Sequence, residues 1–116
     1  MSLKDKTVVI TGASSGIGKA LAQEMAKRGA NIVLAARQYV TLCEITAELE
    51  TKYKTKALAV QCDVSREEDC ELLIKQTLIT FGKIDVLINN AGLGYFGHCD
   101  ELPIEQWHEM FDTNVT

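Results

Sequence analysis

A glycine-rich segment spans residues 11–18 and reads Thr-Gly-Ala-Ser-Ser-Gly-Ile-Gly. It lies between an apolar run and a stretch with helical periodicity, which is the context that a phosphate-binding turn requires. Glycine lets a phosphate approach the backbone closely, and the unpaired N–H groups at a helix N-terminus point at a bound anion. The hydroxyls in this segment add donors, and its last glycine would let the helix lie close to the strand. The candidate phosphate-binding residues are Gly12, Ser14, Ser15, Gly16, Ile17 and Gly18.

The alternative for this segment is a plain tight turn between a strand and a helix. Its glycine spacing, G-x-x-x-G-x-G, differs from the G-x-G-x-x-G of the commonest dinucleotide-binding turn. It also differs from the G-x-x-x-x-G-K-[ST] of nucleoside triphosphatases, which weakens that interpretation.

Apolar runs rich in β-branched residues predict strands at residues 7–10, 31–36, 57–60 and 86–88. Runs that are apolar throughout suit strands buried on both faces of a parallel sheet. Between the runs, apolar residues recur at helical spacing and predict helices. These stripes are Ile17, Ala20, Leu21 and Met25, then Leu42, Ile45 and Leu49, then Cys70, Leu73, Ile74, Thr77, Leu78 and Phe81.

The expected helices have recognisable ends. Gly29 and Gly82 stand where the first and third helices should stop. Ser65 and Glu68 have the Ser-x-x-Glu spacing of a capping box that would open the third helix. A proline at position 103 suits the first turn of a fourth helix, which would run through Trp107 and Phe111. Alternating strands and helices predict right-handed crossovers and an α/β fold with a doubly wound parallel sheet.

Composition narrows the classes of function. The chain has 116 residues, of which 47% are hydrophobic and 24% charged, and we expect one domain over residues 1–116. A net charge of −4 gives no electrostatic basis for binding nucleic acid or an anionic membrane. No apolar run is long enough to span a bilayer or to act as a secretion signal. The four cysteines form no C-x-x-C pair, so we expect buried thiols in a cytoplasmic protein and no metal site.

Three motifs together resemble those of the short-chain dehydrogenase/reductase family. Residues 11–18 resemble its Thr-Gly-x-x-x-Gly-Ile-Gly signature, Asp63-Val64 its adenine-contacting pair, and residues 89–92 its Asn-Asn-Ala-Gly motif. They occur in the family's order and on the matching elements. The resemblance implies a Rossmann-type sheet, truncated after the fourth strand and the helix that follows. It also implies an oxidoreductase that transfers a hydride between a nicotinamide cofactor and a small carbonyl or alcohol substrate.

The residues after the second strand bear on which cofactor is bound. An acidic residue there accepts hydrogen bonds from the adenosine ribose and favours NAD, whereas a nearby arginine accommodates the 2′-phosphate of NADP. Ala36 stands where the acid is expected, and Arg37 follows it. A guanidinium can pair with a phosphate through two parallel hydrogen bonds. We therefore expect NADP(H) to be favoured over NAD(H), with Ser14 as an added donor. The alternative is a solvated arginine that opens the second helix.

The resemblance implies further roles near the cofactor. It places the Asp63 carboxylate near the adenine amino group, with Val64 flanking the ring; the alternative for Asp63 is an acid on the approach to the third helix. At the end of the fourth strand, Asn89 would be mainly structural. The cofactor-facing residues of this motif would be Asn90, Ala91 and Gly92.

One of the family's catalytic residues has a matching position in this sequence. Asn114, within Asp-Thr-Asn-Val-Thr at residues 112–116, matches the asparagine that helps hold a proton-relay water, although an ordinary polar residue near a helix end stays open. The family's tyrosine and lysine are spaced Tyr-x-x-x-Lys, and this pattern does not occur within residues 1–116. We therefore expect the chain alone to be inactive. Residues 86–88 would form an unpaired edge strand, and the full-length protein would be a homo-oligomer.

Two other classes of function stay open. One is a non-catalytic nucleotide-binding fragment or sensor. The other, more distant, is a methyltransferase with a similar glycine turn, against which Arg37 and the Asn-Asn-Ala-Gly motif argue. Residues 93–97 are candidates to border a substrate in a loop, but the pattern selects no substrate within the family's range.

Overall fold

The computed structural model describes residues 2–89 and 95–98 of the chain. Strands and helices alternate through most of it, as the sequence predicts. In chain order the elements are β1 (Thr7–Thr11), α1 (Gly16–Lys27), β2 (Asn31–Ala36), α2 (Tyr39–Tyr53), β3 (Ala57–Gln61), α3 (Glu67–Phe81), β4 (Val86–Asn89) and β5 (Tyr95–His98).

The strands form one sheet in the order β3-β2-β1-β4-β5. Strands β3, β2, β1 and β4 run parallel to one another. Val9 in the central strand β1 pairs with Val33 in β2 and with Leu87 in β4. The chain therefore crosses from β3 at one edge, past β1 and β2, to β4. This crossing makes β1 a central strand and puts the strand order's reversal between β1 and β4, where α/β sheets bind ligands.

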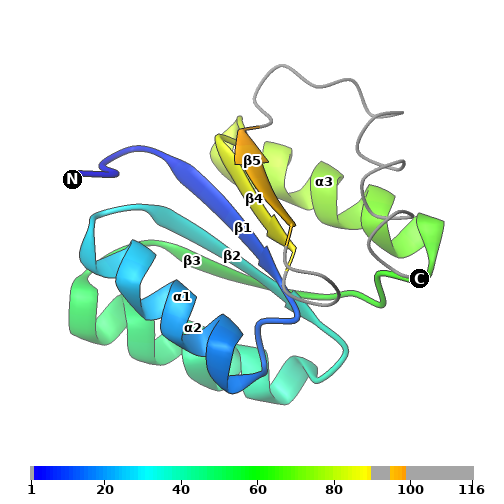
Figure 1. The fold of residues 1–116 in the computed structure, drawn as a ribbon, viewed down its shortest axis with the longest axis horizontal. Coiled ribbons are helices and arrows are strands. Elements are labelled where there is room, and N and C mark those ends of the chain that lie inside the picture. The colour runs from blue at the N-terminus through cyan, green and yellow to red at the C-terminus, as the bar shows by residue number, and fades with distance from the viewer. Residues whose placement is uncertain (1, 90–94, 99–116) are drawn as a thin grey trace.

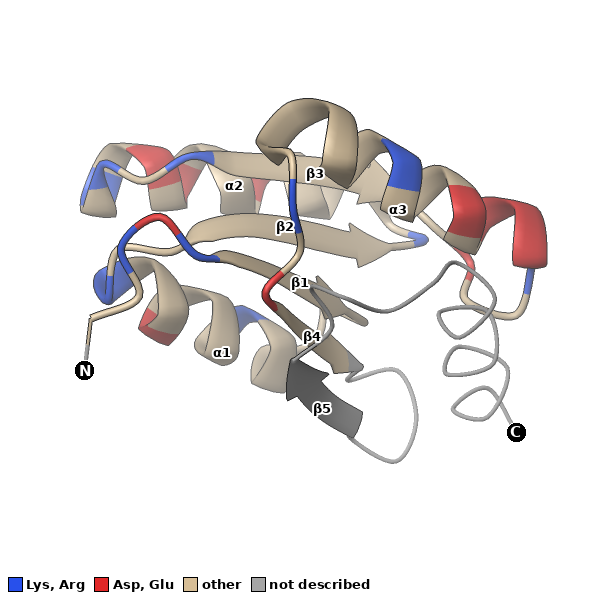
Figure 2. Ribbon diagram, turned by 90° about the horizontal axis from the view of Figure 1, so that it is seen from above, with Lys and Arg blue, Asp and Glu red and all other residues tan. Residues whose placement is uncertain are grey.

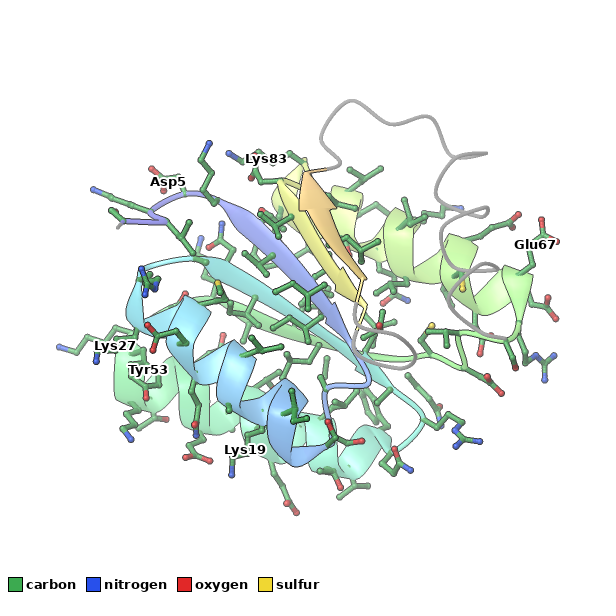
Figure 3. All side chains as sticks on the ribbon, in the orientation of Figure 1. Asp5, Lys19, Lys27, Tyr53, Glu67 and Lys83 are labelled. Atoms are coloured by element: carbon green, nitrogen blue, oxygen red, sulfur yellow. The ribbon has the colours of Figure 1, made fainter. Side chains whose placement is uncertain are left out.

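Helices cover both faces of the sheet (Figure 1). Because side chains alternate along a strand, Val8 and Ile10 of β1 join a core on the side of α1 and α2. Val9 faces the other way and joins a core with Leu73 and Ile74 of α3. Figure 3 shows the side chains that fill the space between helices and sheet. The doubly wound α/β architecture is confirmed.

The stripe that the first helix buries overlaps only in part with the one that its apolar residues predict. Gly18, Ala22 and Ala26 are buried, whereas Ile17 is 69% exposed. A Cβ on Gly18 would lie 2.7 Å from the Cα of Ala13 and 2.7 Å from the carbonyl oxygen of Gly12. Leu21 and Met25 of the predicted stripe are partly buried and pack against the core. The prediction that Ile17 and Ala20 belong to this stripe is wrong, because the close contact of Gly18 with the glycine turn sets which side of α1 is buried.

The predicted capping box at the start of α3 is also absent. The N-cap residue is Arg66, which makes no side-chain cap hydrogen bond. The Ser65 backbone N–H and hydroxyl both bond to Asp63 Oδ1, and Glu68 forms an ion pair with Arg66 at 3.0 Å. The N-cap therefore lies one residue after Ser65, whose N–H and hydroxyl are held in a turn by the carboxylate of Asp63. Three acidic residues still open α3, where they favour the positive end of the helix dipole (Figure 2).

The edge of β4 differs from the prediction as well. Strand β5 pairs with β4 in the antiparallel direction, with Ile88 opposite Phe96. The expectations of an unpaired strand at residues 86–88 and of a loop through residues 95–97 are therefore wrong. Gly97 instead pairs with Leu87, because the backbone groups of β4 supply the pairing partner. The helix expected from residue 103 lies outside the described residues. Within the described part of the chain, no helix has the length and apolar character needed to cross a membrane.

Candidate nucleotide-binding site

A pocket of about 490 Å³ lies at the carboxyl ends of β1, β2 and β3. It gathers six of the residues that were predicted to bind the cofactor, from segments up to about fifty positions apart. Its lining consists of Gly12, Ser14, Ser15, Ala36, Arg37, Gln38, Cys62, Asp63, Val64 and Ser65. Parallel pairing explains this gathering, because the loops that leave neighbouring parallel strands emerge at the same edge of the sheet.

The glycine turn is held by its own hydrogen bonds. Gly12 has a φ of +62°, a conformation that favours glycine. Ser15 donates its backbone N–H (3.3 Å) and its hydroxyl (3.0 Å) to the Gly12 carbonyl oxygen. The same hydroxyl accepts the N–H of Gly18 at 3.1 Å, which makes Ser15 the N-cap of α1. Its hydroxyl proton is therefore used inside the turn, and Ser15 shapes the site rather than offering a spare donor.

The first turn of α1 suits an anion. The N–H groups of Gly16 and Ile17 stand at a helix N-terminus, where an α-helix has no acceptors of its own. A Cβ built on Gly16 meets no protein atom within 4 Å, so the space beside this backbone is open. Backbone donors, open space and a positive helix end together match what a pyrophosphate requires.

The turn between β2 and α2 supplies a cation and no acid. Ala36, 7% exposed, ends β2, and the exposed Arg37 and Gln38 follow it into the pocket lining. Gln61 Nε2 donates to the Arg37 carbonyl oxygen at 3.3 Å, which fixes the backbone of this turn. The Arg37 guanidinium contributes a positive charge to the lining of the pocket.

Asp63 is the carboxylate among the pocket-lining residues. Its Oδ1 accepts the Ser65 N–H at 3.0 Å and the Ser65 hydroxyl at 2.6 Å. Its own N–H donates to Asp69 Oδ2 at 2.9 Å. The hydrogen bonds from Ser65 hold the pKa of the Asp63 carboxyl below its usual range, and the positive charges of Arg37 and Arg66 add to this effect. The carboxylate therefore stays charged and shapes the approach to α3 while it lines the pocket.

Two buried thiols lie behind the end of β3. Cys62 and Cys70 are 2% and 1% exposed. A hydrogen bond with Cys70, followed by burial, raises the pKa of the Cys62 thiol, so this thiol is neutral and a poor nucleophile. Cys70 Sγ donates to the Val64 carbonyl oxygen at 3.6 Å, which steadies the loop that carries Asp63 and Val64. In residues 2–89 and 95–98, no group of His, Cys, Asp and Glu side chains could hold a metal ion.

The remaining predicted site residues fall outside the described part of the chain. They are Asn90, Ala91, Gly92 and Asn114. Asn89 ends β4, and its backbone pairs with Thr11, the first residue of the glycine turn. Strand β4 therefore brings the chain to the same edge of the sheet as the pocket. Sequence reasoning missed Gln38 and Cys62, since neither belongs to a motif; only the position next to Arg37 pointed to Gln38.

Comparisons with known proteins agree with this geometry. The family model for short chain dehydrogenase matches residues 6–116. The uncharacterized oxidoreductase YxnA of Bacillus subtilis (strain 168) is 45% identical over 112 residues, which cover 97% of this chain and 31% of that protein. The chain thus spans about a third of the length of this relative.

Two solved structures of similar fold hold different nicotinamide cofactors. L-sorbose reductase from Gluconobacter frateurii, complexed with NADPH and L-sorbose, superposes with a TM-score of 0.77 at 41% identity, covering 93% of this chain and 41% of that one. A 3-ketoacyl-(acyl-carrier-protein) reductase from Brucella melitensis, complexed with NADH, has a TM-score of 0.72 at 39% identity, covering 81% and 37%. With the family model matched along nearly its whole length, this chain belongs to the short-chain dehydrogenase family.

Proposed function

We propose that the protein is an NADP(H)-dependent oxidoreductase and that this chain supplies the adenosine and phosphate half of its cofactor site. The nicotinamide, when bound, supplies the hydride chemistry between the cofactor and a carbonyl or alcohol substrate. The observation that carries this proposal is the β2–α2 turn, which lines the pocket with Ala36, Arg37 and Gln38 and contributes no carboxylate.

Charge explains why this turn favours a 2′-phosphate. A phosphate monoester carries roughly −1.5 to −2 charges near neutral pH, so an acid at Ala36 would repel it. The Arg37 guanidinium can instead form two parallel hydrogen bonds to phosphate oxygens. The NADPH complex of L-sorbose reductase supports this assignment. The NADH complex of the Brucella reductase shows that family membership does not decide it, so Arg37 has to be tested directly.

Other residues of the pocket take complementary roles in this proposal. Gly12, Gly16 and Ile17 would hold the pyrophosphate with backbone N–H groups, and Gly18 would let α1 approach the strand. Asp63 and Val64 would border the adenine. Asn90, Ala91 and Gly92 would continue the site beyond β4. Asn114 would serve the proton relay.

Wider properties of the protein belong to the same proposal. The protein would be a cytoplasmic homo-oligomer, and its buried thiols Cys62 and Cys70 fit a reducing compartment. Residues 1–116 would form one domain. The similar structures include a reductase with L-sorbose bound and a 3-ketoacyl-(acyl-carrier-protein) reductase. Because their substrates differ, we propose only the substrate class, a carbonyl or alcohol compound.

Titration with NADPH and NADH tests the proposal. Replacing Arg37 with alanine should weaken NADPH binding about ten- to hundredfold, because a charged hydrogen bond is worth roughly 1.5–3 kcal/mol. NADH binding should change little. Arg37→Lys is the matched control, since it keeps the charge but loses the paired geometry and should fall between the two. Equal losses for both cofactors would overturn the assignment of Arg37 to the 2′-phosphate.

A further inference from the structure

A side-chain hydrogen bond joins the two loops that face each other across the mouth of the pocket. The Ser14 hydroxyl, in the glycine turn, donates to Gln38 Oε1 at 3.0 Å. Gln38 is the direct neighbour of Arg37, and both Ser14 and Gln38 line the pocket. This bond therefore ties the turn for the pyrophosphate to the turn for the proposed 2′-phosphate.

The same turn is also held from its other side. Gln61, at the end of β3, donates from Nε2 to the Arg37 carbonyl oxygen at 3.3 Å. Gln61 thus fixes the backbone at Arg37, and Ser14 fixes the neighbouring side chain of Gln38. The Arg37 guanidinium takes part in neither bond, so both bonds place the arginine without using its charge.

The orientation of the Gln38 amide controls where the Ser14 hydroxyl proton goes. A serine hydroxyl has a single proton to donate, and Ser14 gives it to Gln38 Oε1. While that bond exists, the hydroxyl cannot donate to an anion in the pocket. A glutamine side chain ends in both a carbonyl oxygen and an NH₂ group. Rotating this amide by half a turn would present a donor to the Ser14 oxygen, which then accepts and has its proton free for the pocket.

We propose that Gln38 is a positioning residue that determines specificity for a 2′-phosphate, by holding Ser14 beside Arg37 and by releasing the Ser14 hydroxyl proton to that phosphate. This inference rests on the proposed function. It predicts that a neutral amide at position 38 supports binding of the 2′-phosphate and that a carboxylate of similar shape weakens it. Glutamate at position 38 would still accept from Ser14, but it cannot donate back, and its negative charge would repel the phosphate.

The test uses two nucleotides that differ only in the 2′-phosphate, adenosine 2′,5′-bisphosphate and adenosine 5′-monophosphate. Calorimetry gives the Kd of each for the protein and for Ser14→Ala, Gln38→Met and the double variant. Each single variant should weaken the bisphosphate about two- to tenfold, the range of one net hydrogen bond. The double variant should lose no more bisphosphate affinity than the more strongly affected single variant, because both changes break the same bond. The monophosphate Kd should stay nearly constant throughout.

Gln38→Glu supplies a readout that a merely structural role would not move. Its loss of bisphosphate affinity should exceed that of Gln38→Met. This loss should also grow between pH 5 and pH 8, because the second ionisation of a phosphate monoester lies near pH 6. Thermal unfolding of each variant checks that the fold is unchanged, as expected for the exposed Gln38.

The outcomes separate this inference from the proposed function. If the protein prefers the bisphosphate, and Arg37→Ala removes that preference while the Gln38 variants leave it intact, the inference alone fails. It also fails if the losses of the two single variants multiply in the double variant, or if both nucleotides weaken equally. A protein that does not distinguish the two nucleotides, with or without Arg37, would overturn the proposed function and the inference together.

Discussion

The two ends of the parallel sheet are built differently. At the amino ends of the strands, Asp85 accepts the Thr7 N–H through Oδ2 at 2.8 Å and donates its own N–H to the Thr7 carbonyl oxygen at 2.9 Å. Lys83 Nζ lies 3.4 Å from the same carboxylate oxygen. At the carboxyl ends, glycine, hydroxyl and guanidinium groups line an open pocket. Figure 3 labels Lys83 at the first end and Glu67, which opens α3, toward the second.

The difference follows from the direction of the chain. In a parallel sheet with helical crossovers, every helix begins at the carboxyl ends of the strands and ends at their amino ends. The carboxyl end therefore collects helix N-termini, with their unpaired N–H groups and positive dipole ends. At the amino end, the carboxylate and the backbone satisfy one another. Changes that fill the open space at the pocket end should chiefly alter binding, and changes to the paired groups at the other end should chiefly alter stability.

Two glycines of the same turn should separate binding from folding most sharply. Gly16→Val adds a side chain where a Cβ meets nothing within 4 Å, so the protein should fold but the cofactor's phosphate should be blocked. Several charged hydrogen bonds of about 1.5–3 kcal/mol each would be lost, so the NADPH Kd should rise at least about a hundredfold.

Gly18→Val is the matched comparison. Its Cβ would lie 2.7 Å from backbone atoms of Ala13 and Gly12, and such overpacking should cost about 3 kcal/mol or more of folding free energy. NADPH fluorescence titration and denaturant unfolding measure the two effects. Unchanged affinity in folded Gly16→Val would mean that this turn does not cradle a phosphate.

Asp85→Ala tests the opposite end of the sheet. Asp85 is 7% exposed, and removing its carboxylate leaves the buried N–H of Thr7 without its acceptor. The free energy of unfolding should fall by about 2–3 kcal/mol, with no change in the ratio of NADPH to NADH affinity. Asp85→Asn should lose less, because its amide oxygen can still accept from Thr7. A change in cofactor preference in a folded Asp85 variant would contradict the separation of the two ends.

Ser15→Ala should have a smaller, mixed effect. The Ser15 hydroxyl caps α1 by accepting the Gly18 N–H, and N-cap loss costs typically about 1 kcal/mol of stability. The NADPH Kd should rise only a few fold, because the hydroxyl proton is already bound to the Gly12 carbonyl oxygen. Ser15→Thr keeps a capping hydroxyl and should behave like the wild type in both unfolding and titration. Full loss of binding in a stable Ser15→Ala protein would show a direct phosphate contact instead.

The smallest expected effect is the pH response of Asp63. Hydrogen bonds from Ser65 lower the pKa of this carboxyl in the folded protein. A depressed folded pKa contributes stability above the unfolded pKa, near 3.9, and that contribution is lost as the pH falls through the folded pKa. Ser65→Ala should therefore raise the Asp63 pKa toward its ordinary value. NMR titration of the side-chain carboxyl measures it, with Thr at position 65 as the control that keeps a hydroxyl. An unchanged pKa in Ser65→Ala would assign the effect to Arg37 and Arg66.

The sequence alone determined much of the framework of this protein. Apolar runs placed the first four strands to within a residue at each end, and Gly29 and Gly82, with φ of +95° and +78°, mark helix ends as predicted. Residues 11–18 identified the glycine turn. These features are local, because a strand's apolar pattern and a glycine's freedom are properties of short segments.

Tertiary structure decided what depends on distant partners. Ile17 is exposed because Gly18, and not Ile17, is the residue of α1 that packs against the glycine turn, and Ser65 is not the N-cap because α3 begins after Arg66. Strand β5 forms because β4 offers its backbone groups. Gln38 belongs to no motif, yet it meets Ser14 across 24 positions of sequence because β1 and β2 end side by side. Such contacts are set by the packing of the sheet and its helices, which no short segment of sequence contains.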